Sequence, residues 1–133
     1  MSETMPTLLL IEDEDLLRSG VQEIFELNGF HVIGAEDGLE AMHWLYETQI
    51  DLVVTDLLMP NMNGVELIAK LTRSHPDLPV ILVSGANNLV KERLGIQSLE
   101  SLGAKATFTK PFKSDELVSK AKELVTASLS RVA

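Results

Sequence analysis

Five residues whose side chains can take part in chemistry stand at the ends of short apolar runs. Glu12 and Asp13 follow TLLLI, Asp56 follows LVVT, and Ser84 follows VILV. Lys110 follows ATFT and precedes a proline. Apolar runs of this length, bounded by polar or turn-forming residues, are typical of buried strands. The sequence therefore indicates three carboxylates, a hydroxyl and an ammonium group at strand ends.

This set of groups is suited to phosphoryl chemistry around a metal ion. Three carboxylates close together repel one another, and a divalent cation removes that repulsion. Mg²⁺ prefers oxygen ligands and keeps several waters, so two or three carboxylates and a backbone carbonyl suffice. Asp56 has a second available role, because a carboxylate can act as a nucleophile and form an aspartyl phosphate. Lys110 and the metal would offset the charge of the transferred group, and Ser84 could donate a hydrogen bond.

Strand-like and helical segments alternate along the chain, which predicts an α/β fold with a parallel sheet and helices on both faces. Runs that are apolar at every residue fit a sheet covered on both sides. No internal repeat or linker interrupts the pattern, so one domain is expected. The expected strands lie at 7–11, 30–34, 51–56, 79–85 and 106–109, and the expected helices lie within 12–29, 37–48, 64–76, 87–102 and 114–129.

Apolar residues three or four positions apart define the expected core faces of the helices. The first helix presents Leu17, Val21 and Ile24, and the last opens with Ser114 as an N-cap before two acids. The second and third helices present Leu39, Met42, Leu45, Tyr46, Val65, Ile68 and Leu71.

Ligands of open α/β sheets bind outside the carboxyl ends of the strands. Taken singly, each candidate residue has a structural interpretation. The acids at 12–15 could face a helix N-terminus, Asp56 could simply end a strand, and Ser84 and Lys110 could be surface residues. Their coincidence at the same ends of several strands favours a site.

Composition excludes several other classes of protein. The 133 residues contain no cysteine, so a disulfide framework or a thiolate metal site is impossible. The formal net charge of −9 argues against nucleic-acid binding, which needs clustered Lys and Arg. No apolar run approaches the roughly 18 residues that span a bilayer, and the start lacks signal-peptide character. A soluble, cytoplasmic protein is expected.

Long motifs give the chain a family resemblance. The segments LLLIEDED, DLVVTDLLMPNMNGVELI, PVILVSGA and GAKATFTKPF resemble the receiver domain of a two-component response regulator, nearly end to end. The resemblance implies a doubly wound, flavodoxin-like sheet of five parallel strands in the order 2-1-3-4-5, with five helices. It also assigns the site, with Asp56 as phosphoacceptor, Glu12, Asp13 and the backbone carbonyl of Leu58 as further metal ligands, Lys110 as the lysine beside the phosphoryl group, and Ser84 and Phe108 as switch residues.

The resemblance further implies a phosphorylation-activated switch. A histidine kinase or a histidine phosphotransfer protein would supply the phosphoryl group in the presence of Mg²⁺, and the modified domain would act on an output domain or a downstream protein, with an oligomer as one form of the active state. Such a protein catalyses only its own phosphorylation and dephosphorylation. The expected domain is 1–133, with a core at about 6–128 and a tail or the start of a linker at 129–133.

Three alternative functions share some of these features. A flavodoxin-type electron carrier would need a Ser/Thr/Gly-rich phosphate loop after the first strand, where this chain has EDED. A haloacid-dehalogenase-type phosphatase needs a second aspartate two residues after its nucleophile, where this chain has Leu58. A phosphorylation-independent interaction module of receiver shape is the more serious rival, against which the complete residue set argues.

Two segments depart from a simple pattern. The apolar loop 57–64 should cover the site, with Pro60 and Gly64 fixing its turn. The stretch from Ser84 to Lys110 is longer than is usual for the family. Apolar residues on opposite sides of 87–102 predict a helix that breaks at Gly95.

Overall fold

The computed structural model describes residues 5–57, 64–85 and 103–132. Three predictions lie outside these residues: the helix at 87–102 with its break at Gly95, the turn at Pro60, and the carbonyl of Leu58. The described residues form five strands and four helices.

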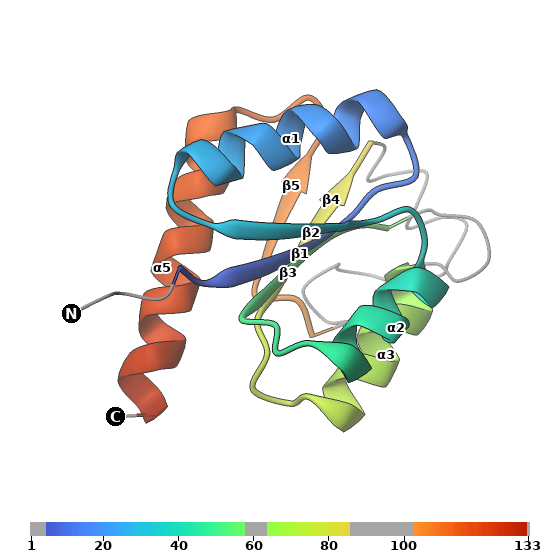
Figure 1. The fold of residues 1–133 in the computed structure, drawn as a ribbon, viewed down its shortest axis with the longest axis vertical. Helices are drawn as coiled ribbons and strands as arrows, with labels where there is room; N and C mark the ends of the chain where they lie inside the picture. The colour runs from blue at the N-terminus through green and yellow to red at the C-terminus, as the bar shows by residue number, and fades with distance from the viewer. Residues whose placement is uncertain (1–4, 58–63, 86–102, 133) are drawn as a thin grey trace.

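A single parallel sheet forms the centre of the fold (Figure 1). Its order is β2-β1-β3-β4-β5, as the sequence resemblance implies, and every neighbouring pair is parallel. The chain crosses over after the second strand, so β1 and β3 lie side by side at the centre. The strands are β1 (Thr7–Ile11), β2 (His31–Ala35), β3 (Leu52–Asp56), β4 (Val80–Ser84) and β5 (Ala106–Thr109).

Helices cover both faces of this sheet, which confirms the doubly wound architecture (Figure 1). Residues of α1 and α5 pack in one apolar cluster, and residues of α2 and α3 pack in the other. Within the described residues, no helix is both long enough and apolar enough to cross a membrane. The helices are α1 (Asp15–Leu27), α2 (Gly38–Glu47), α3 (Gly64–Ser74) and α5 (Ser114–Val132).

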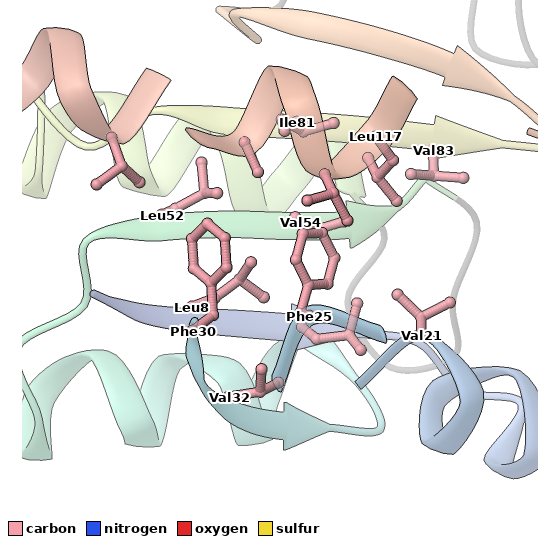
Figure 2. Packing of buried hydrophobic residues seen from close by; sticks show 14 residues of the cluster. Leu8, Val21, Phe25, Phe30, Val32, Leu52, Val54, Ile81, Val83 and Leu117 are labelled. Carbon is pink, nitrogen blue, oxygen red and sulfur yellow. The ribbon is translucent and has the colours of Figure 1, made fainter. Parts of the chain in front are cut away.

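Successive residues of the central strands serve the two clusters in turn. In β1, Leu8 and Leu10 face α1 and α5, whereas Leu9 and Ile11 face α2 and α3. Side chains alternate across a strand, so a strand covered on both faces must be apolar throughout. Figure 2 shows the first cluster, in which Phe25 and Phe30 meet edge to face with ring centroids 5.3 Å apart.

The core face of α2 agrees with the prediction at Met42 and Leu45, which pack in the α2–α3 cluster, and differs from it at two positions. Leu39 and Tyr46, expected in the core, are 56% and 80% exposed. The buried residues are Gly38, Ala41 and Leu45, which also follow helical spacing. Small residues on that face allow the helix axis to approach the sheet, and a search for large apolar residues misses them.

Two other helical details also differ from the prediction. Phe25 is fully buried on α1 together with Val21, although the predicted core face omitted it. Ser114 is the first helical residue of α5, so the N-cap position belongs to Lys113, whose carbonyl accepts from the N–H of Leu117. The α5 backbone continues to Val132, and the expectation that 129–133 are a tail or the start of a linker stays a prediction.

Candidate functional site

Four strands bring the predicted residues to one edge of the sheet. Asp56 and Ser84 are the last residues of β3 and β4. Glu12 directly follows β1, and Lys110 directly follows β5. Because all the strands are parallel, their carboxyl ends lie at the same edge. Residues distant in the sequence therefore meet where ligands of this architecture bind.

Three carboxylates converge at this edge. Glu12, Asp13 and Asp56 each offer an oxygen, and these oxygens all lie within 4.8 Å of one another. The side chains of Glu12 and Asp56 are only 8% and 11% exposed, whereas Asp13 is exposed to solvent. Carboxylate oxygens are the ligands that Mg²⁺ prefers, and the exposed side leaves room for its waters. The donor set therefore fits a hard divalent cation.

Lys110 connects two of these carboxylates. Its Nζ donates to Glu12 Oε1 at 3.0 Å and to Asp56 Oδ2 at 2.9 Å. Burial lowers the pKa of the ammonium group, but the hydrogen bonds and charges of Asp56 and Glu12 outweigh burial and raise this pKa above its usual value. Lys110 is therefore protonated at neutral pH and supplies the positive charge of the site.

The pKa of the Glu12 carboxyl is also raised, but here burial is the largest cause. Burial raises the pKa of its carboxyl, and the charge of Asp56 adds to this effect. The hydrogen bonds from the N–H of Glu14 and from Lys110 lower the pKa but do not cancel the rise. The repulsion predicted for a buried group of acids is thus present.

The backbone around Asp56 is held from several sides. The Thr55 hydroxyl, fully buried, donates to the carbonyl of Asp56 at 2.8 Å. The N–H of Leu57 donates to Val83 of β4 at 3.2 Å, which extends the strand pairing past Asp56. The N–H of Gly64 then donates to the carbonyl of Leu57 at 2.7 Å. The chain leaving β3 is therefore fixed where α3 begins.

Gly64 allows a close backbone approach that no other residue permits. A Cβ at Gly64 would lie 2.8 Å from Leu57 Cα and 2.9 Å from the carbonyl oxygen of Asp56. Both contacts are with backbone, which cannot rotate away. The structure confirms that a helix begins at Gly64, and the reason for glycine is this contact.

We expect Gly64→Ala to lower the free energy of unfolding by about 1–3 kcal/mol, because the new methyl group must push the Asp56–Leu57 backbone away. Gly20→Ala is the matched control, since Gly20 lies in α1 and a Cβ there meets nothing within 4 Å. That control should be stabilised by about 0.4–1 kcal/mol. Urea unfolding of the two variants measures the difference. Equal stability of both would contradict the close-contact explanation.

The two predicted switch residues lie on the neighbouring strands β4 and β5. Ser84 is 2% exposed, and its carbonyl accepts from the N–H of Lys110 at 2.8 Å. Phe108 is half-buried on β5, opposite Val83 of β4, and packs against the α1–α5 cluster. The backbone thus couples the hydroxyl residue, the lysine and the aromatic residue through the β4–β5 pair.

Sequence reasoning missed Thr55 and Arg18. Arg18 lies in the first turns of α1 and donates to the backbone carbonyl of Glu12 at 2.7 Å. Neither residue belongs to the acid cluster, so only their contacts reveal them. A basic residue shortly after an acidic strand end was the one available signal.

Comparisons with known proteins agree with this geometry. A model of the response regulator receiver domain matches residues 8–122. The aerobic respiration control protein ArcA of Escherichia coli is 34% identical over 125 residues, which cover 94% of this chain and 50% of that protein. The transcriptional regulatory protein CpxR of Escherichia coli is 34% identical over 124 residues, covering 93% of this chain and 51% of that protein. The chain thus spans about half the length of these relatives.

A solved structure shows the same fold with a metal present. The response regulator protein TrrA of Thermotoga maritima, in complex with Mg²⁺ and BeF, has a TM-score of 0.79 and 28% identity. The match covers 90% of this chain and 99% of that chain. The Mg²⁺ and BeF belong to that structure, and the match shows that the two chains share a fold.

Proposed function

The chain belongs to the response regulator receiver domain family, and we propose that it works as a switch in which Asp56 accepts a phosphoryl group with the help of Mg²⁺. The observation that carries the proposal is the convergence of Glu12, Asp13 and Asp56 within 4.8 Å, with Lys110 bonded to two of them. These groups match the needs of a phosphoryl acceptor and of a cation that neutralises it.

The carboxylate of Asp56 is the nucleophile in this proposal. One of its oxygens forms a bond with phosphorus, and the phosphorus–nitrogen bond of a phosphohistidine breaks as the imidazole nitrogen leaves. Mg²⁺, when bound, offsets negative charge on the phosphoryl oxygens and the carboxylates. Glu12, Asp13, Asp56 and the carbonyl of Leu58 would hold it.

Lys110 and Ser84 respond to the new group. Lys110 Nζ, now bonded to Glu12 and Asp56, pairs with a phosphoryl oxygen, and the Ser84 hydroxyl donates to another. Movement of Ser84 passes to Phe108 through the β4–β5 pairing. We assign the response to the face around β4 and β5, which a partner then recognises.

The proposed partners are those that membership of the family implies. A histidine kinase or a histidine phosphotransfer protein supplies the phosphoryl group. The receiver acts on an output domain or a separate protein, with oligomerisation as one form of the output. We propose no turnover reaction on an external substrate, because the group added to this chain is the signal itself.

The decisive test is metal-dependent labelling. With acetyl phosphate and Mg²⁺, intact-mass analysis of the wild type should show one added phosphoryl group, and EDTA should prevent it. Asp13→Asn leaves both Lys110 hydrogen bonds in place. The Mg²⁺ concentration for half-maximal labelling of this variant should be at least about tenfold higher than for the wild type. Absence of labelling by acetyl phosphate and by a phosphohistidine donor would favour the phosphorylation-independent interaction module instead.

A further inference from the structure

The peptide between the two adjacent acids lies just beyond the sheet. The N–H of Glu12 donates to the carbonyl of Ala35 at 3.0 Å, which continues the pairing of β1 and β2 by one residue. The carbonyl of Glu12 accepts from Arg18 Nη1 at 2.7 Å. A side chain of α1 thus holds the chain at the point where the sheet ceases to do so.

The guanidinium of Arg18 is held at two points. Nη1 donates to the Glu12 carbonyl, and Nη2 donates to Asp15 Oδ1 at 2.7 Å. The Arg18 side chain is 20% exposed, although its acidic partner is 80% exposed. A guanidinium presents a rigid, planar set of donors, so fixing one nitrogen on Asp15 also fixes the direction of the other.

Gly34 makes room for this side chain. A Cβ at Gly34 would lie 3.3 Å from Arg18 Cδ, 3.3 Å from Gln22 Oε1 and 3.6 Å from Arg18 Nε. Gly34 lies opposite Leu10 in the register of β1 and β2, one residue before the strand ends. The stem of Arg18 therefore passes close over β2 on its way to the end of β1, and a larger residue at Gly34 would displace it.

The Glu12–Asp13 peptide decides where Asp13 points. Asp13 is exposed, so side-chain packing contributes little to its orientation. Glu12 is buried and bonded to Lys110. Fixing the carbonyl between them therefore fixes the direction in which the chain presents the exposed carboxylate.

We propose that Arg18 is a positioning residue of the metal site, which aims the Asp13 carboxylate by holding the Glu12 carbonyl, and that Gly34 is required for it to do so. The inference rests on the proposed function, since it concerns the affinity of the same site for Mg²⁺. Positive charge alone would act in the opposite direction, because a guanidinium beside the carboxylates repels a second cation. The sign of the effect therefore separates the two roles.

Titration calorimetry with Mg²⁺ alone tests the proposal. Arg18→Ala should weaken Mg²⁺ binding about tenfold, as is usual for residues that orient metal ligands. Arg18→Lys keeps the positive charge but lacks a planar guanidinium that donates through two nitrogens. This variant should also bind Mg²⁺ more weakly. Arg73→Ala is the matched control, since it removes an exposed arginine in the last turn of α3 and should leave the affinity unchanged.

Gly34→Val provides an independent arm. It should weaken Mg²⁺ binding in the wild-type background and have little further effect in Arg18→Ala. Urea unfolding without Mg²⁺ verifies that each variant is folded before titration. Arg18→Ala or Arg18→Lys binding Mg²⁺ as tightly as the wild type, or tighter, would overturn the positioning role. A wild type that does not bind Mg²⁺ would overturn the proposed function itself.

Discussion

Asp56→Asn should abolish the addition of a phosphoryl group, because the amide nitrogen that replaces one carboxylate oxygen leaves no anionic nucleophile at the end of β3. The backbone geometry at the end of β3 should persist, because the hydrogen bonds of Thr55 and Leu57 there are made with backbone carbonyls and do not involve the Asp56 carboxylate. Intact-mass analysis after treatment with acetyl phosphate and Mg²⁺ should show the phosphoryl group in the wild type and none in the variant.

A matched control shows whether the loss of labelling is specific to position 56 or follows from any aspartate-to-asparagine change. Asp115→Asn makes the same chemical change at an exposed site in the first turn of α5, and labelling should be unaffected. Peptide mapping of the wild type should locate the group on the segment that contains Asp56. Equal labelling of Asp56→Asn and the wild type would show that another residue is the acceptor.

Lys110→Met should lower the free energy of unfolding without Mg²⁺ by about 1–3 kcal/mol, since it leaves two largely buried carboxylates without their shared cation. Adding Mg²⁺ should narrow this difference, because the metal then supplies the missing positive charge. Mg²⁺ affinity should be retained or increased, whereas the conformational response to phosphorylation should weaken. Urea unfolding measures the stability, titration calorimetry measures the Mg²⁺ affinity, and hydrogen exchange with and without acetyl phosphate measures the conformational response.

Lys120→Met is the control for this second experiment. Lys120 pairs with Glu123 on the surface of α5 at 3.1 Å, so its loss should change stability by less than about 1 kcal/mol. Loss of Mg²⁺ binding in Lys110→Met would show that the lysine helps to form the metal site.

The strands and their edge were predictable because each depends on local features. A run such as TLLLI is apolar at every residue because helices cover both faces, and Glu12 follows it directly. Asp56, Ser84 and Lys110 have the same relation to their strands. The order of the strands came from the family resemblance, since local patterns do not encode which strands are neighbours.

Contacts between elements could not be predicted in the same way. The helical period of α2 is compatible with a face containing Leu39 and with one containing Ala41, and only the fit against the sheet selects the second. The bond from Arg18 to the Glu12 carbonyl depends on a side-chain path over Gly34. The closeness of Gly64 to the Asp56 backbone similarly needs the three-dimensional arrangement.

The bond between Lys110 and Glu12 joins residues 98 positions apart, and that with Asp56 spans 54 positions. During synthesis on the ribosome, at roughly 5–20 residues per second, the acids therefore emerge several seconds before the lysine. A nascent chain that lacks β5 holds the carboxylates without their internal counterion, and a cation from solution is then the available substitute. Completion of β5 thus adds the lysine that bonds Glu12 and Asp56, so the internal positive charge reaches the site after its carboxylates.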